Sequence, residues 1–427
     1  MAGGTTRARA HVDECVHCGF CLPVCPTWHV WGAEMDSPRG RIDLVKAVRD
    51  GRLALTGEVA EHLDRCLGCM ACLPACPSGV RYDRIIEEAR EARERAVPRA
   101  TADRLHRALL FAVLPYPRRL RVAAVLLWLY RATGLAWLVR VTGLPLPRRL
   151  AAAVALAPPV SLATLSYPKE FALPAQGARR LKVGLVTGCV QGTFFPGVNA
   201  ASARVLAAEG CEVVVPEGQG CCGALSAHAG RLAESRQMVR ALVERFEVAG
   251  VDVVVVNSAG CGSHLKDCER LFEGDAFFER ARAFSARVRD VNELVASLEP
   301  RATRHPIAAK VAFHAPCHLA HAQRVGAAPR ALLTGIPGLE VVDVGEAEGC
   351  CGSAGVYNLV QPEAAEQIGA RKAQAVLATG APWLASANPG CTLHVLRMLR
   401  ERSASVRAAQ PIEFLDASIR GLREPEG

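Results

Sequence analysis

The 427-residue chain lacks several features that would assign it to a common class of protein. It contains no P-loop and no G-x-S-x-G nucleophile elbow, and we find no site for a flavin of its own. Met1–Asp13 shows no signal peptide, so we expect a cytoplasmic chain in a reducing compartment. Eighteen cysteines in such a compartment indicate metal chemistry rather than a disulfide framework.

Acidic residues are missing from residues 104–169, whereas ten basic residues lie there. These are Arg104, Arg107, Arg118, Arg119, Arg121, Arg131, Arg140, Arg148, Arg149 and Lys169. Subtracting these ten from the net charge of +9 leaves about −1 for the rest of the chain. The basic charge is therefore local, and we expect no nucleic acid as a partner.

The same segment lacks an apolar run that could cross a membrane at low cost. Its best candidate span, Val122–Leu146, carries Arg131 and Arg140, and each would cost about 2.5–3.5 kcal/mol at the bilayer centre. Prolines divide the segment, which predicts short helices (Pro115, Pro117, Pro145, Pro147, Pro158 and Pro159). Two interpretations stay open: a helical hairpin on an anionic membrane surface, or a linker packed on its own domains or on a partner subunit.

Two cysteine runs near the N-terminus share the spacing C-x2-C-x2-C-x3-C, and a proline follows each run. This spacing is typical of two-cluster ferredoxins, in which three thiolates of one run and the last thiolate of the other hold each [4Fe–4S] cluster. We therefore predict one cluster on Cys15, Cys18, Cys21 and Cys76. The second cluster is predicted on Cys66, Cys69, Cys72 and Cys25.

A pair of zinc knuckles is the alternative reading of these runs, because C-x2-C is also a zinc spacing. Zinc ligands come in two pairs, however, and not as three evenly spaced cysteines with an outlier. Helices are predicted over Ser37–Asp50, between the runs, and over Arg81–Val97, after the second run. Residues 1–100 are thus predicted to form a ferredoxin-type 2[4Fe–4S] domain.

From residue 181 onward, short apolar strands alternate with cysteine-containing loops and helices. Three predicted strands lead to cysteines: Leu181–Val186 to Cys189, Glu212–Val215 to Cys221-Cys222, and Val251–Val256 to Cys261. Helices are expected over Val198–Glu209 and Ser263–Phe272. This order predicts parallel βα units, in which functional sites lie beyond the carboxyl ends of the strands.

The same order then repeats, from Lys310–His314 to Cys317, Leu339–Val344 to Cys350-Cys351, and Pro382–Ala387 to Cys391. The corresponding cysteines lie 128, 129 and 130 positions apart. We therefore expect two similar α/β domains, residues 181–304 and 305–427, after a basic apolar helical linker over residues 101–180. The predicted fold class is α+β overall, with a small helical module followed by two parallel-sheet domains.

Each copy resembles the cysteine-rich CCG domain, which occurs in heterodisulfide reductase and in subunits of flavin-linked dehydrogenases. That resemblance implies an iron–sulfur cluster or zinc, although the last cysteine of the family pattern is a histidine in both copies. The candidate ligands in the first copy are Cys189, Cys221, Cys222, Cys261 and His264. Those in the second copy are Cys317, Cys350, Cys351, Cys391 and His394. An ordinary cubane, a zinc ion and no metal all stay open.

Three further histidines, His314, His318 and His321, crowd Cys317, and each alone is more typical of a surface or capping position than of a ligand. Cys211 and Cys268 lie outside every pattern and are expected to be packing residues.

The order of two ferredoxin runs, a basic linker and two CCG domains resembles the iron–sulfur subunit family of bacterial glycolate oxidase. Short stretches carry the likeness: Thr187–Gln191, Cys221–Ala224, Phe313–Cys317 with His321–Gln323, and Cys350–Gly355. Subunits of anaerobic glycerol-3-phosphate dehydrogenase and lactate-utilisation proteins have a similar architecture.

The resemblance implies a complex in which FAD-binding subunits oxidise glycolate to glyoxylate. This chain, with no catalytic residue of its own, would carry electrons toward membrane quinone from the cytoplasmic face of the inner membrane. The alternatives are the iron–sulfur subunit of a glycerol-3-phosphate or lactate dehydrogenase complex, a heterodisulfide reductase-like thiol–disulfide enzyme, and a metal-stabilised scaffold.

Overall fold

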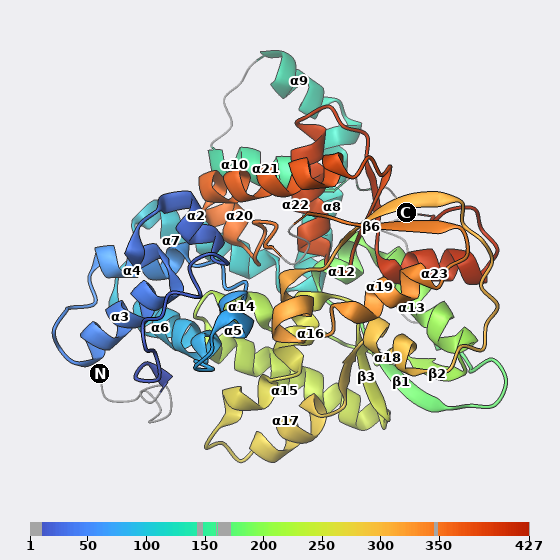
Figure 1. The fold of residues 1–427 in the computed structure, drawn as a ribbon, viewed down its shortest axis with the longest axis horizontal. Helices are drawn as coiled ribbons and strands as arrows, with labels where there is room; N and C mark the ends of the chain where they lie inside the picture. Colours follow the sequence, from blue (N-terminus) through green and yellow to red (C-terminus); the bar gives the residue numbers. More distant parts are fainter. Residues whose placement is uncertain (1–10, 143–147, 159, 161–171, 346–348, 427) are drawn as a thin grey trace.

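A computed structural model describes residues 11–142, 148–158, 160, 172–345 and 349–426 (Figure 1). A small helical module, drawn in blue, packs beside two α/β domains that carry green to red colours. The helices of the linker lie against both α/β domains. The mixed architecture confirms the fold class predicted from the sequence.

The N-terminal module consists of short helices around the two cysteine runs. They are α2 (Pro26–Trp31), the 3-10 turn η1 (Glu34–Asp36), α3 (Pro38–Arg49), α4 (Gly57–Arg65), α5 (Cys72–Ala75) and α6 (Tyr82–Ala96). Helix α3 begins where the sequence places it, because the Ser37 hydroxyl accepts a hydrogen bond from the Gly40 N–H at 3.1 Å. The helices predicted over residues 37–50 and 81–97 are therefore confirmed.

The described part of the linker contains the short helices α7 (Thr101–Val113), α8 (Pro117–Ala132), α9 (Leu135–Thr142) and α10 (Arg148–Leu156). Pro117 occupies the first position of α8, where its missing N–H costs no helical hydrogen bond. No helix in the described ranges is both long and apolar enough to cross a membrane. The last residues of the predicted span Val122–Leu146 lie outside the described residues.

Each α/β domain contains a four-stranded parallel sheet. The first has the order β2-β1-β3-β4, with β1 (Leu181–Val186), β2 (Cys211–Val214), β3 (Val253–Val256) and β4 (Val288–Asp290). The second has the same order, β6-β5-β7-β8, with β5 (Ala309–His314), β6 (Leu339–Asp343), β7 (Trp383–Ser386) and β8 (Arg407–Ala409). The identical topology confirms the repeat predicted from the cysteine spacing.

Two details of the sequence-based reading were wrong. The edge strands β4 and β8 were not predicted, because three residues are too short to show an alternating pattern. The helix expected over Ser263–Phe272 is instead the end of α16 (Ala259–Leu265) followed by the 3-10 turn η2 (Cys268–Phe272). Cys211 opens β2 and Cys268 opens η2, and both side chains are buried.

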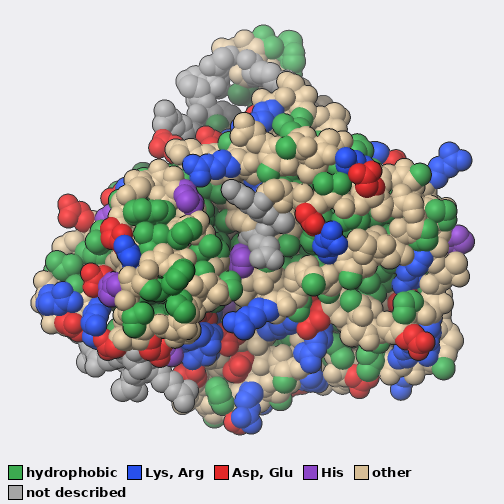
Figure 2. All heavy atoms as spheres, viewed as in Figure 1, with side chains coloured by type: hydrophobic (Ala, Val, Ile, Leu, Met, Phe, Trp, Pro, Cys, Tyr) green, Lys and Arg blue, Asp and Glu red, His purple; other side chains and the backbone are tan. Residues whose placement is uncertain are grey.

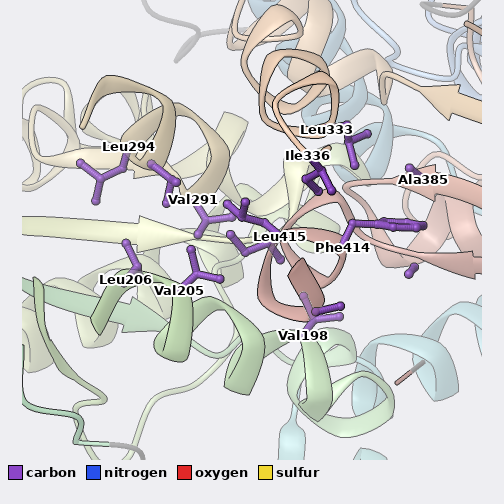
Figure 3. Packing of buried hydrophobic residues seen from close by; sticks show 14 of the residues in the cluster. Val198, Val205, Leu206, Val291, Leu294, Leu333, Ile336, Ala385, Phe414 and Leu415 are labelled. Carbon is purple, nitrogen blue, oxygen red and sulfur yellow. The ribbon is translucent and has the colours of Figure 1, made fainter. Parts of the chain in front are cut away.

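The two α/β domains exchange helix contacts in a pseudo-twofold manner. Helix α13 (Pro196–Ala208) of the first domain packs on α23 (Pro411–Ile419) of the second, and α18 (Val291–Ser297) packs on α19 (Ala327–Thr334). Figure 3 shows the shared core, to which α13 gives Val198, Val205 and Leu206, and α23 gives Phe414 and Leu415. This continuous core joins the two copies into one body.

Helix α6 ties the N-terminal module to the first α/β domain through a buried carboxylate. Glu87 accepts hydrogen bonds from Arg270 and, at 3.3 Å, from Nδ1 of His228. Burial alone would raise the pKa of Glu87, but the charge of Arg270 and the bond from His228 outweigh it, so the pKa lies well below its usual value. Glu87 is therefore ionised and fully paired.

Replacing Glu87 with Gln should destabilise the chain, because the buried charge of Arg270 loses its buried partner and keeps only the partly exposed Asp267. We expect a loss of about 3 kcal/mol and a clearly lower thermal midpoint. The matched variant Glu91→Gln breaks only an exposed pair with Arg95 and should cost less than about 0.5 kcal/mol.

The difference in stability between the wild type and Glu87→Gln should also depend on pH. A lowered carboxyl pKa stabilises the fold fully above the pKa of an unfolded glutamate, about 4.3, and the gain disappears as the pH falls toward the folded pKa. Equal midpoints for the two proteins at neutral pH would contradict this account of the junction.

Candidate metal centres

The first three cysteines of run one and the last cysteine of run two surround one open pocket. Cys15, Cys18, Cys21 and Cys76 all line it, and Cys72 reaches its inner edge. Cys18 is exposed, and the other three members of the predicted set are half-buried. Four thiols around one hollow are the donor set that a cubane requires, so the residues present fit the predicted cluster.

The second set of cysteines lies deeper in the protein. Cys25, Cys66, Cys69 and Cys72 are all buried. Burial raises the pKa of the Cys72 thiol, and the neighbouring Cys69, Cys66 and Cys25 thiolates raise it further. Cys25 therefore lies beside the second run, as the interchanged ligand pattern requires.

Cationic and polar groups surround the buried set. Burial opposes ionisation of Cys66, but the charges of Arg41 and Arg90 outweigh it, and the pKa of this thiol lies below its usual value. The Cys66 sulfur also accepts hydrogen bonds from the Tyr82 hydroxyl at 3.4 Å and from the Gly68 N–H at 3.3 Å. Such donors stabilise thiolate charge in a buried site and tune the potential of a bound cluster.

The two sets differ in what lies around them. Three exposed hydrophobic side chains, Val16, Phe20 and Val24, stand on the loop of the first run, and Phe20 is 65% exposed. Figure 2 shows hydrophobic side chains gathered on the N-terminal module, at the left of the view. The loop of the second run is covered instead, since His318 Nε2 donates to the Gly68 carbonyl at 2.9 Å and Tyr357 donates to the Arg65 carbonyl at 3.1 Å.

In the first α/β domain, the four predicted cysteines converge where the strand order reverses. Cys189 follows β1 and Cys261 follows β3. These two strands are neighbours at the point where the strand order reverses, and an open parallel sheet has a crevice there, beyond the carboxyl ends of its strands. The Cys189 and Cys221 sulfurs are 3.5 Å apart. Contacts with Cys221 and Cys261 raise the pKa of Cys222, which places all four thiols together.

The glycine after each vicinal cysteine pair is required by close packing. Gly223 has a φ of 87°, and a Cβ there would lie 2.7 Å from the Ser235 hydroxyl oxygen on α15 (Leu232–Ala249). Gly352 has a φ of 89°, and a Cβ there would lie 2.7 Å from the Ala365 carbonyl oxygen on α21 (Pro362–Ala378). Both turns direct the cysteines inward.

Residues Gly218–Gly223 also fit the spacing G-x-G-x-x-G, which in other folds opens a dinucleotide-binding helix. Here the helix that follows, α14 (Ala224–His228), has only five residues, and the turn carries the buried Cys221 and Cys222. The stretch therefore serves the cysteine cluster and does not form a nucleotide site.

His264 lies behind this cluster, on the same helix as Cys261. Its Nε2 atom is 3.1 Å from the Ser235 hydroxyl, and its buried Nδ1 atom has no hydrogen-bond partner among the described residues. Burial and the nearby charge of Arg270 lower its pKa to about 3, so the ring is neutral. The structure thus places His264 near the CCG glycine, and its role as a ligand stays a prediction.

In the second α/β domain, the structure brings together a histidine and cysteines that the sequence did not combine. His314, Cys351 and Cys391 are buried, and their potential ligand atoms lie within 4.8 Å of one another. Cys317 lies beside Cys350. A hydrogen bond between the two thiols, and then burial, raise the pKa of Cys317. His314 ends strand β5, and thus faces the same crevice as Cys391 after β7.

His394, the predicted fifth ligand of this copy, is engaged elsewhere. Its Nε2 atom donates to the Ala365 carbonyl at 3.0 Å. A Cβ on Gly352 or Gly369 would lie within 3.2 Å of that nitrogen, so the ring fills the space behind the CCG turn. The histidine that the structure groups with Cys351 and Cys391 is His314, which the sequence reading treated as an ordinary residue. The buried Nδ1 atom of His394 has no hydrogen-bond partner among the described residues, and its role as a ligand stays a prediction.

Only the fold could have identified His314. Its signal is a position at the carboxyl end of a central strand, next to the strand that carries Cys391. At the corresponding position of the first domain, 128 residues earlier, the chain has Val186. The two cysteine clusters are therefore chemically different in spite of their repeat.

The second cluster of cysteines touches the buried ferredoxin set. The pKa of Cys69 is raised well above its usual value, first by a hydrogen bond with the Cys350 thiol and then by burial. Cys69, Cys317 and Cys350 also share one packed hydrophobic cluster with Tyr357. The described structure thus joins the inner ferredoxin site directly to the second α/β domain.

Comparisons with known proteins match nearly the whole chain in the order that the structure shows. Residues 11–80 match the 4Fe-4S dicluster domain, and residues 183–266 and 311–396 match the cysteine-rich domain called CCG. Residues 102–157 match the linker region of the glycolate oxidase iron–sulfur subunit.

Two relatives are similar over most of their length. The probable glycolate oxidase iron–sulfur subunit of Bacillus subtilis is 37% identical over 94% of this chain and 93% of its own. The glycolate oxidase iron–sulfur subunit of Escherichia coli is 36% identical over 89% of both chains. A crystal structure of a hypothetical protein from Helicobacter pylori has the same fold, with a TM-score of 0.56 at 8% identity, over 97% of this chain and 73% of that one.

The match to the linker, the 4Fe-4S dicluster domain and both CCG domains agrees with the site geometry described above. The full-length identity to two relatives extends this agreement along the chain. The chain belongs to the family of glycolate oxidase iron–sulfur subunits.

Proposed function

We propose that this chain is the electron-transfer subunit of a complex that oxidises glycolate to glyoxylate. FAD-binding partner subunits would carry out the oxidation, and this chain would pass the electrons toward a quinone in the membrane. One observation carries the proposal: one group of cysteines lines an open pocket at an exposed loop, and a second group lies buried in the protein interior. Such a series suits conduction from a docking surface to an inner site.

The proposed ligands are those predicted from the two runs. Cys15, Cys18, Cys21 and Cys76 would hold the outer [4Fe–4S] cluster, and Cys66, Cys69, Cys72 and Cys25 the inner one. When bound, two such clusters supply one-electron steps between a two-electron flavin and a two-electron quinone. Arg41 and Arg90 offset the negative charge of the inner thiolates, and the fold around them excludes water.

The interchange of the fourth ligand can be tested with single cysteine variants. Protein purified without oxygen should contain about eight irons per chain. In the reduced protein, the electron paramagnetic resonance spectrum of Cys25→Ala should resemble that of Cys69→Ala, because both lose an inner ligand. Likewise, Cys76→Ala should resemble Cys18→Ala.

Each of these variants should retain about four irons from its undisturbed cluster. A Cys25→Ala spectrum that matches Cys18→Ala would contradict the interchange, because it would place Cys25 with its own run. Zinc in place of iron in the anaerobic wild-type protein would contradict the proposed function itself.

The flavin-bearing partner would dock at the outer cysteine set. Val16, Phe20 and Val24 present apolar surface around the exposed Cys18, and apolar contact over a redox site brings donor and acceptor close while excluding water. The cysteines of the inner set are all buried, and His318 and Tyr357 bind its loop. Electrons would therefore enter through the first run.

Phe20→Asp should slow electron entry without loss of the clusters. Phe20 is exposed, so the charge costs the free chain little, but it would be buried unpaired in the docked complex. We expect glycolate-dependent reduction of this chain by the FAD subunits to fall about tenfold or more, which corresponds to about 1.4 kcal/mol. Iron content and the electron paramagnetic resonance spectrum should stay unchanged.

A matched control for Phe20→Asp is Val248→Asp, an exposed hydrophobic position on α15 of the first α/β domain. The control should accept electrons at the wild-type rate. Equal rates for Phe20→Asp and wild type would exclude this loop as the docking surface.

The second CCG domain is proposed to hold one metal ion. Tetrahedral zinc with sulfur and nitrogen ligands needs donor atoms about 3.7 Å apart, and the grouping of His314, Cys351 and Cys391 within 4.8 Å is close to that requirement. Cys317 or Cys350 could complete the set. The first CCG domain offers cysteines without this histidine, so its cluster is the weaker candidate.

Removal of His314 should lower the metal content of the second domain. His314→Ala should lose the zinc, or any iron beyond eight, when the protein is dialysed against a chelator, whereas His394→Ala should retain it. The zinc and iron content of the wild type and both variants is measured by elemental analysis after the same anaerobic purification. Wild-type protein with eight irons and no other metal would contradict the proposed site.

A further inference from the structure

The outer side of helix α8 is apolar, which is the reverse of an ordinary surface helix. Leu120 and Ala124 are buried, and they make the inner face of the helix. Val122, Val125, Leu126 and Leu129 are exposed, and their spacing of three and four residues places them on one outer stripe. Val122 and Leu126 are 61% and 60% exposed.

The neighbouring helices extend this stripe. Leu105 and Leu109 are exposed on α7, and Leu135, Trp137, Leu138 and Val141 are exposed on α9. Helix α8 contacts both α7 and α9, and α9 projects from the body of the protein at the top of Figure 1. We call these six residues, together with the four on α8, the linker surface.

The linker surface accounts for most of the exposed hydrophobic side chains of the protein. Seventeen large hydrophobic residues are exposed in the described residues, and eleven of them, including Tyr116, lie between Leu105 and Val141. Scattered exposed hydrophobics need no explanation, but such a concentration marks a surface that is covered in use. The described parts of the linker do not bury this face on the chain's own domains.

The charge around the linker surface identifies what covers it. Residues 104–169 contain no acidic residue, and Glu234, which accepts a hydrogen bond from the Tyr116 hydroxyl at 3.3 Å, is itself paired with Arg231. Arg104, Arg118 and Arg119 are exposed beside the apolar stripe, and the guanidinium of Arg119 stacks on Tyr116 with 4.4 Å to the ring centroid. Arginine, tyrosine and tryptophan at the margin of an aliphatic face are typical of the headgroup region of a membrane.

We propose that the linker surface binds the headgroup and outer acyl region of a membrane rich in anionic lipid. Helices α7, α8 and α9 would lie in the plane of the interface, because none of them is long and apolar enough to cross the bilayer. The aliphatic side chains enter the acyl boundary, and the arginines bind lipid phosphates. A protein partner would not require that residues 104–169 contain no acidic residue at all.

This surface would hold the chain beside a membrane quinone, so its biological role rests on the proposed electron transfer. The test of lipid binding itself does not depend on electron transfer. Lipid binding can be measured on the full chain with its clusters, without FAD subunits and without glycolate, and a failure of either proposal is therefore visible separately.

The experiment is flotation of the full chain, purified without oxygen, with vesicles of phosphatidylglycerol and phosphatidylcholine or of phosphatidylcholine alone. Wild-type protein should float with the anionic vesicles, and higher salt should weaken the binding. The double variant Val122→Glu/Leu126→Glu should bind about tenfold more weakly or not at all, because it places two acids on the stripe. Arg118→Gln/Arg119→Gln should lose the preference for anionic lipid.

The matched control is Val248→Glu/Leu377→Glu, which makes the same chemical change at exposed hydrophobic positions on α15 and α21. It should float like the wild type. All variants are compared at equal iron content and equal circular dichroism, so that a folding defect is recognised.

Two results would overturn the proposal. One is absence of flotation by the wild type, and the other is equal flotation by both double glutamate variants. Protection of the linker surface from hydrogen exchange by the FAD subunits, without any vesicle binding, would assign the surface to a protein partner.

Discussion

A buried circuit of polar contacts through Glu87 fixes the cysteine loops against the rest of the protein. Glu87 on α6 binds Arg270 and His228 of the first α/β domain. The His228 ring packs edge-on against the His318 ring of the second domain, with 5.0 Å between the ring centroids. His318 donates in turn to the Gly68 carbonyl, in the middle of the second cysteine run. Since burial lowers the pKa of His318 to about 4, this ring is neutral, and the circuit contains one compensated charge pair.

Through this circuit, the N-terminal module and both α/β domains together hold the inner cysteine set in place. Arg90, one turn beyond Glu87, donates to the carbonyls of Cys66 and His228, which joins the same elements a second time. Close packing supports these bonds, because a Cβ on Gly230 would lie 2.6 Å from the backbone of Arg90. The N-terminal module is therefore not a free ferredoxin tethered by a linker, and its inner loop cannot open without disturbing both CCG domains.

The sequence predicted the features that depend on local spacing. The cysteine runs, the central strands and the 128 to 130 residue repeat all follow from periodicity or composition, and the structure agrees with each. The short strands β4 and β8 were not predicted, because three residues are too few to show a period. The position of His314 beside Cys391 was not predicted for another reason: it comes from the pairing of β5 with β7, which no local pattern encodes.

The two CCG copies share a topology but occupy different environments, and this difference constrains their roles. Near the pseudo-twofold axis the corresponding segments that follow β3 and β7 contact each other, since Ala259 donates to the Ala387 carbonyl at 3.1 Å and Gly260 donates to Asn388 at 3.4 Å. Away from the axis the equivalence ends. The second copy has His314 where the first has Val186, and its Cys350 meets Cys69 of the inner ferredoxin set.

A duplicated domain needs only one copy in contact with the electron path, and the other can then evolve toward packing. The first copy shows that direction, because its cluster is backed by His264 and by the Glu87 junction and touches none of the eight ferredoxin cysteines in the contacts described above. Chemistry proposed for the CCG centres therefore belongs first to the second copy, whose sulfur atoms lie against the inner thiols.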